Sequence, residues 1–63
     1  MKTLFIVYIR KEAIGWARNA IDAIGIKEHM ARTRYNNNDS PLYIKRYNDD
    51  NEEYEMIKKK LFN

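Results

Sequence analysis

The stretch TLFIVYIR, residues 3–10, decides the fold class of this chain. β-branched and aromatic residues fill it, and these residue types favour a β-strand. Apolar side chains fall on both faces of the strand, with Leu4, Ile6 and Tyr8 on one face and Phe5, Val7 and Ile9 on the other. This pattern is typical of a central strand that is covered on both sides. In so small a protein, we expect another subunit to supply the second cover.

The segments that follow predict a helix and then a hairpin. Residues 12–24, EAIGWARNAIDAI, repeat alanine and isoleucine at helical spacing, and Gly25 is suited to end this helix in the left-handed conformation. Residues 28–35 and residues 42–47 have the composition and alternation of strands. Between them lies NNNDSP, residues 36–41, whose side chains favour turns. The sequence therefore predicts a β-hairpin after the helix.

Residues 51–62 are predicted to form the last helix. Asp50 is the expected N-cap, with Glu53 as its reciprocal partner. The apolar stripe of this helix consists of Tyr54, Ile57 and Leu61. The expected fold is therefore a small α+β domain that spans residues 1–63 in the order β-α-β-β-α. We expect its sheet to pack on two helices and dimerisation to complete it.

A second organisation of residues 12–35 replaces the helix and first hairpin strand by two helices around Gly25. The stretch AIDAIGIKEHMA loosely resembles a helix-turn-helix, with Gly25 in the turn and Ala31 at a later buried position. The resemblance implies a DNA-binding protein whose second helix directs Arg32 and Arg34 towards the DNA.

Composition excludes several classes of site. Cysteine is absent and His29 is the single histidine, which excludes disulfides and a multi-histidine metal site within one chain. Gly15 and Gly25 are the two glycines, so a glycine-rich phosphate loop and its nucleotide cofactor are excluded and no cofactor is expected. A domain of 63 residues buries only about 60% of its unfolded surface, so we expect a homodimer.

Charge and hydropathy indicate the compartment and the class of partner. The formal net charge is +3, which mildly favours anionic partners. No apolar run approaches the roughly 20 residues that cross a bilayer, and the start of the chain lacks a signal-peptide pattern. We therefore expect a cytoplasmic protein without a membrane partner. Ile, Lys, Asn and Tyr number 27 of 63 residues, which indicates an AT-rich genome and favours a phage-like viral origin.

The predicted hairpin is the principal candidate site. It interleaves four cations with three tyrosines, namely Arg32, Arg34, Lys45 and Arg46 with Tyr35, Tyr43 and Tyr47. Guanidinium groups bind phosphates in a bidentate manner, and aromatic rings stack on nucleobases. The hairpin is therefore predicted to bind a nucleotide, a signalling oligonucleotide or single-stranded nucleic acid. The competing interpretation is the solvated face of a two-sided sheet.

Other groups of residues have simpler explanations. Tyr8 and Trp16 are candidate interface anchors, since tyrosine and tryptophan are enriched at the energetic centres of contacts. Lys58, Lys59 and Lys60 suit the negative end of a helix dipole better than a phosphate site. The acidic stretch before the last helix suits capping better than a cation site. His29 beside Glu28 has no nucleophile near it in the sequence, so no catalytic residues are expected.

These observations predict a non-enzymatic binding protein, a homodimer that sequesters an anionic ligand through the hairpin. The first alternative is a small inhibitor of a host protein, anchored by Trp16 and tyrosines. The second is the helix-turn-helix-like DNA-binding protein.

Overall fold

The computed structural model describes residues 2–34 and 41–62 and confirms the predicted α+β class. It contains three strands and two helices, but their order is β-β-α-β-α instead of β-α-β-β-α. The elements are β1 (Thr3–Ile9), β2 (Glu12–Ala17), α1 (Ala20–Thr33), β3 (Leu42–Asn48) and α2 (Glu52–Phe62). None of the helices in the described part of the chain is long and apolar enough to cross a membrane.

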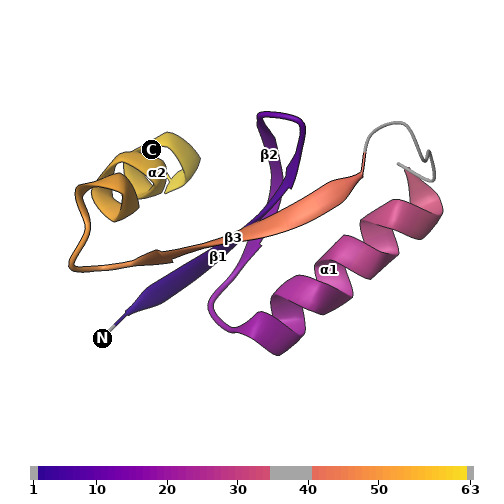
Figure 1. Cartoon of the computed structure of the whole chain (residues 1–63), viewed down its shortest axis with the longest axis horizontal. Coiled ribbons are helices and arrows are strands. Elements are labelled where there is room, and N and C mark those ends of the chain that lie inside the picture. The colour runs from indigo at the N-terminus through magenta and orange to yellow at the C-terminus, as the bar shows by residue number, and fades with distance from the viewer. Residues whose placement is uncertain (1, 35–40, 63) are drawn as a thin grey trace.

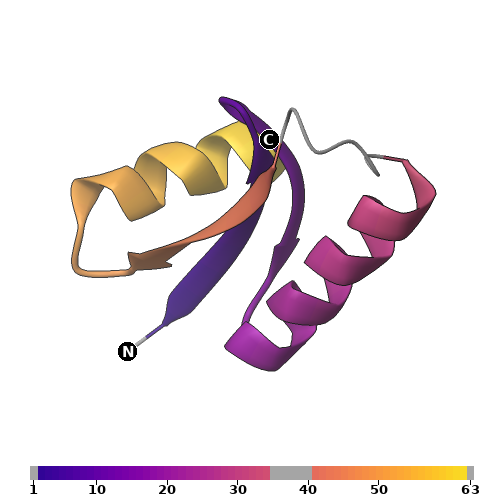
Figure 2. The same cartoon turned by 45° about the vertical axis from the view of Figure 1, so that its right-hand side comes forward.

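Strand β1 lies at the centre of the sheet, and β2 and β3 flank it as antiparallel edge strands. The two helices lie on opposite sides of this sheet, as both views show (Figure 1, Figure 2). Helix α2 covers the face of β1 that carries Leu4 and Ile6, through Tyr54, Ile57 and Leu61. Helix α1 covers the opposite face, where its Ile26 side chain packs against Gly15 of β2. The chain therefore covers both faces of β1 itself, and the expectation that a second subunit covers one of them is wrong.

Residues 12–17 form β2 and not the predicted helix. The pairing of β2 with β1 contains an irregularity in which Val7 faces Gly15 and Tyr8 faces Ala13, so Ile14 is an extra, bulged residue. A bulge interrupts the alternation that identifies a strand. The remaining spacing of apolar residues imitates a helix, which explains the error.

The predicted strand at residues 28–35 is also wrong, because α1 runs from Ala20 to Thr33 without a break at Gly25. Asn19 caps its start, since the Asn19 side chain accepts a 2.8 Å hydrogen bond from the backbone N–H of Asp22. Gly25 is therefore not a C-cap, and the helix ends at Arg34 instead. A strand followed by a single helix also contradicts the helix-turn-helix organisation.

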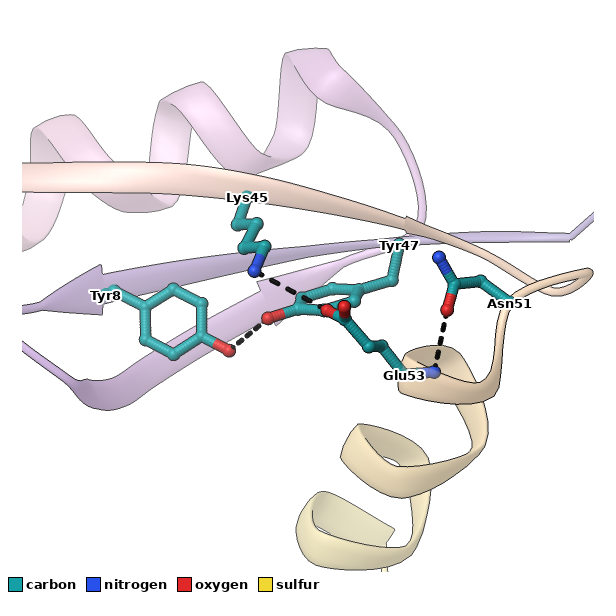
Figure 3. Close-up of polar contacts among 5 residues, drawn as sticks. All are labelled: Tyr8, Lys45, Tyr47, Asn51 and Glu53. Atoms are coloured by element: carbon teal, nitrogen blue, oxygen red, sulfur yellow. Dashed lines mark hydrogen bonds and ion pairs between the residues drawn. The ribbon is translucent and has the colours of Figure 1, made fainter.

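Helix α2 confirms the prediction for residues 51–62 to within one residue, but its cap is different. The Asn51 side chain accepts a 2.9 Å hydrogen bond from the backbone N–H of Glu53, so Asn51 takes the role predicted for Asp50 (Figure 3). The side chain of Glu53 turns to Lys45 on β3 and not to the cap. Strand β3 confirms the predicted strand at residues 42–47.

Candidate functional site

The structure divides the residues of the predicted hairpin between two elements. Arg32 lies on α1 and Arg34 at its C-cap, whereas Lys45 and Arg46 lie on β3. Strand β3 pairs with β1 and not with residues 28–35, so the predicted ribbon is wrong. Tyr35 lies outside the described residues. The six members of the predicted site that the structure describes are therefore not brought together as a group.

Two of the four cations that the hairpin was predicted to present have acidic neighbours. Arg32 lies 3.7 Å from Glu28, one helical turn away, and Lys45 lies 3.5 Å from Glu53. All four side chains are well exposed, and exposed ion pairs contribute only about 0–1 kcal/mol. Register places Lys45 opposite Ile6 and Arg46 opposite Phe5, so the two cations point to opposite faces of the sheet.

Tyr47, one of the predicted stacking tyrosines, and Tyr8, a predicted interface anchor, both belong to the core. The Tyr47 ring is buried, and its hydroxyl group lies 2.7 Å from that of Tyr8 in a buried hydrogen bond (Figure 3). Burial raises the pKa of Tyr8 above its usual value, and the hydrogen bond to Tyr47 raises it further. Tyr8 is therefore a core residue that does not reach the surface as an interface anchor.

Tyr43 differs from these residues, because its ring is both held in place and 45% exposed. It stacks on Tyr8 with a centroid distance of 5.3 Å and an interplanar angle of 17°. Its hydroxyl group donates a hydrogen bond to the backbone carbonyl of Arg10, in the turn between β1 and β2. These two contacts fix the ring at the edge of the sheet while a large part of it faces solvent.

Basic residues neighbour Tyr43 both along β3 and in the turn whose backbone its hydroxyl group contacts. Lys45 is two residues further along the same face of β3, where its ammonium group lies 5.2 Å from the centroid of the Tyr47 ring. On the other side, the carbonyl contact brings the turn of Arg10 and Lys11 next to Tyr43. We call Tyr43, Lys45, Arg10 and Lys11 the Tyr43 platform. It offers one stacking surface and several positive charges.

Sequence reasoning missed Arg10 and Lys11 as members of a site, because only the pairing of β3 with β1 brings this turn to Tyr43. A partial signal was present: Arg10 and Lys11 separate two strands by two residues, which is the length of a tight hairpin. Arg10 has a positive φ of 56°, as the turn requires of one of its residues. Recognising β2 as a strand would have placed the turn correctly.

The second candidate feature is an open groove between β2 and α1, with a volume of about 870 Å³. Helix α1 lines it with one continuous face: Ile21, Asp22, Gly25, Ile26, His29 and Met30. Trp16 and Arg18 line the opposite side. Trp16 is 40% exposed, packs edge-on against Phe62 at 4.8 Å and lies under the guanidinium of Arg18 at 5.6 Å. We call this feature the β2–α1 groove.

The remaining candidates lie on the surface without a built site. His29 and Glu28 are exposed neighbours on α1, and Lys58, Lys59 and Lys60 are exposed on α2. Asp49 accepts a 2.9 Å hydrogen bond from the backbone N–H of Lys2, and so joins the start of β1 to the end of β3. Within residues 2–34 and 41–62, His, Asp and Glu side chains form no group of three or more that could hold a metal ion.

Comparisons with protein-family models, with curated proteins and with solved structures find no match to this chain. The functional argument therefore depends on the Tyr43 platform and the β2–α1 groove.

Proposed function

We propose that this chain is a non-enzymatic binding protein for a ligand that combines phosphate with a nucleobase, such as a nucleotide or a short single strand of nucleic acid. The observation that carries the proposal is the Tyr43 ring, fixed by Tyr8 and the Arg10 carbonyl yet 45% exposed. A ring that is already immobilised loses little conformational freedom when a base stacks on it. We also propose that the protein is located in the cytoplasm.

Positive charge around the ring supports the phosphate half of the proposal. The ion pair between Lys45 and Glu53 is long and exposed. A ligand phosphate can therefore replace the Glu53 carboxylate beside Lys45 with little loss of free energy. Arg10 and Lys11 lie in the turn whose backbone Tyr43 contacts, and their charges add to the attraction of an anion. Binding of this kind requires a stacking surface and charge, and it requires no catalytic group.

The test measures binding of a fluorescein-labelled oligothymidine by anisotropy, with unlabelled nucleoside triphosphates as competitors. We expect Tyr43→Ala to weaken binding by about tenfold or more, because base stacking on one aromatic ring contributes about 1–3 kcal/mol. Tyr43→Phe retains the ring and should bind much more tightly than Tyr43→Ala. Lys45→Ala should reduce the slope of log affinity against log salt by about one.

A matched control comes from the cations that the structure places elsewhere. The double variant Arg32→Ala with Arg34→Ala removes two charges from the end of α1 and should retain most of the binding. If this variant loses binding while Tyr43→Ala binds like the wild type, the Tyr43 platform is not the site. Absence of binding to either class of ligand at low salt would contradict the proposal itself.

The alternative function, a small inhibitor that binds a host protein, is favoured by the exposed apolar residues of the β2–α1 groove. Trp16 would be its anchor, since a partly exposed tryptophan beside a groove is typical of a contact centre. Apolar contacts are not screened by salt, so such a complex should survive high salt, whereas phosphate binding should not. Capture of one defined protein that Trp16→Ala abolishes would favour this alternative.

A further inference from the structure

We propose that the ligand is a single strand of at least two nucleotides, in which one base stacks on Tyr43 and the neighbouring base enters a cavity between β3 and α2. This inference rests on the proposed function, because it extends the Tyr43 platform along β3. It names an oligonucleotide, and not a free mononucleotide, as the class of ligand.

The cavity lies between one face of α2 and the edge strand β3. Its volume is about 360 Å³, at the lower end of the range for small-molecule sites, so it suits one ring system and not a large ligand. Residues at helical spacing line it from α2, and one tyrosine lines it from β3: Glu53, Met56, Ile57, Lys60 and Tyr47. The Met56 side chain is 70% exposed and adaptable in shape, so it is available to pack on an incoming ring.

Lys45 connects the Tyr43 platform to this cavity. Tyr43, Lys45 and Tyr47 lie on one face of β3, as their register with β1 shows. The ammonium group of Lys45 lies 3.5 Å from the Glu53 carboxylate and 5.2 Å from the centroid of the Tyr47 ring, and both of these residues line the cavity (Figure 3). Lys45 is two residues, or about 7 Å along the strand, from each tyrosine. A phosphodiester bound to Lys45 therefore has the exposed ring on one side and the cavity on the other.

The chemistry of the cavity suits a neutral base better than a second phosphate. The Glu53 carboxylate repels a phosphate, whereas Met56 and Ile57 offer apolar contacts to the flat face of a base. Cytosine and adenine also carry an exocyclic amino group that donates a hydrogen bond to a carboxylate. When a phosphate replaces Glu53 beside Lys45, this amino group gives the carboxylate a new partner. A nucleoside diphosphate or triphosphate has no second base and leaves these contacts unused.

The position of Lys60 at the cavity distinguishes it from the two lysines before it. All three side chains are exposed on α2, but Lys58 and Lys59 lie on another face of the helix, beside Glu55 and Phe62. The charge of Lys60 adds attraction for a strand that enters the cavity. Lys59 carries the same charge one residue away without lining the cavity, and therefore supplies a matched control.

Competition against the labelled oligothymidine separates the two ligand classes in the full-length protein. The competitors are the 5′-phosphorylated dinucleotide of deoxycytidine and deoxycytidine diphosphate, which carry similar charge but differ by one base. The dinucleotide should compete about tenfold more strongly, because its second base makes contacts of its own. Tyr43→Ala should weaken both competitors, so this variant reports on the proposed function separately.

Charge reversal at the two neighbouring lysines locates the second base. Lys60→Glu places a carboxylate at the cavity and should remove the advantage of the dinucleotide over the diphosphate. Lys59→Glu changes the net charge equally and should retain that advantage. Both positions are exposed, so far-ultraviolet circular dichroism should show the wild-type spectrum for both variants.

Two results would overturn this inference while the proposed function stands or fails by Tyr43→Ala alone. One is a dinucleotide that competes no better than the diphosphate with the wild-type chain. The other is an equal loss of the dinucleotide's advantage in Lys59→Glu and Lys60→Glu, which would show that net charge and not the cavity is responsible.

Discussion

At the scale of single residues, Tyr8 illustrates why a sequence rich in tyrosine does not by itself predict a binding surface. Its ring stacks on the ring of Tyr43, and its hydroxyl group shares a buried hydrogen bond with Tyr47. A buried phenol needs a partner for its hydroxyl group, and the neighbouring tyrosine supplies it. Tyrosine identity in the sequence cannot separate Tyr8 and Tyr47, which hold the fold, from Tyr43, whose ring remains available.

Tyr8→Phe should lower the free energy of unfolding by about 1 kcal/mol, because it leaves the Tyr47 hydroxyl group without its buried partner. Urea unfolding near neutral pH measures this loss. Tyr43→Phe removes a hydroxyl group at an exposed ring and is the matched control, with a smaller expected effect. Equal stability of Tyr8→Phe and the wild type would contradict a structural role for this hydrogen bond.

The raised pKa of Tyr8 also predicts how stability depends on pH. The folded chain holds the Tyr8 proton more tightly than the unfolded chain, in which tyrosine ionises near its usual pKa of about 10. The contribution of Tyr8 is therefore fully present below about pH 10 and is lost as the pH rises through and above that value. Urea unfolding between about pH 8 and pH 11 should show this decline, and Tyr8→Phe should make it shallower.

At the scale of elements, the strongly patterned segments could be predicted from the sequence, and β2 could not. The β-branched run of β1 and the charged, capped pattern of α2 each indicate one structure. The bulge at Ile14 removes the alternation of β2, and its alanines favour a helix in isolation. Pairing with β1 overrides that preference. A prediction that takes β2 for a helix needs another strand, takes it from residues 28–35, and therefore places the candidate site there.

Gly15 is the position at which β2 and α1 depend most directly on each other. Gly15→Ala places a methyl group 2.8 Å from the Ile26 Cγ2 atom, so it should cost about 1–3 kcal/mol of stability. Ile26→Ala removes that atom and leaves space for the new methyl group. The double variant should therefore lose less stability than the two single variants together. Strict additivity in urea unfolding would show that the two residues do not meet.

At the scale of the whole molecule, a three-stranded sheet with one helix on each face allows a chain of 63 residues to cover both faces of its central strand. Both faces of β1 are apolar, and an uncovered face would leave Leu4 and Ile6 in water. The chain resolves this with its own two helices, so dimerisation is not needed to cover a face.

This arrangement makes the stability of the molecule depend on how firmly α2 is attached. Tyr54 is the buried residue of α2, at 2% exposure, and it packs in the cluster that contains Leu4 and Ile6. Tyr54→Ala should cost about 3–5 kcal/mol, as large-to-small changes of buried aromatic residues do. Natural domains retain only about 0.05–0.15 kcal/mol per residue, so this loss approaches the whole stability of the chain.

Thermal denaturation followed by circular dichroism should therefore show Tyr54→Ala largely unfolded at room temperature. Met56→Ala, on the exposed side of the same helix, should melt like the wild type. If Tyr54→Ala melts like the wild type as well, α2 does not hold this face of the sheet.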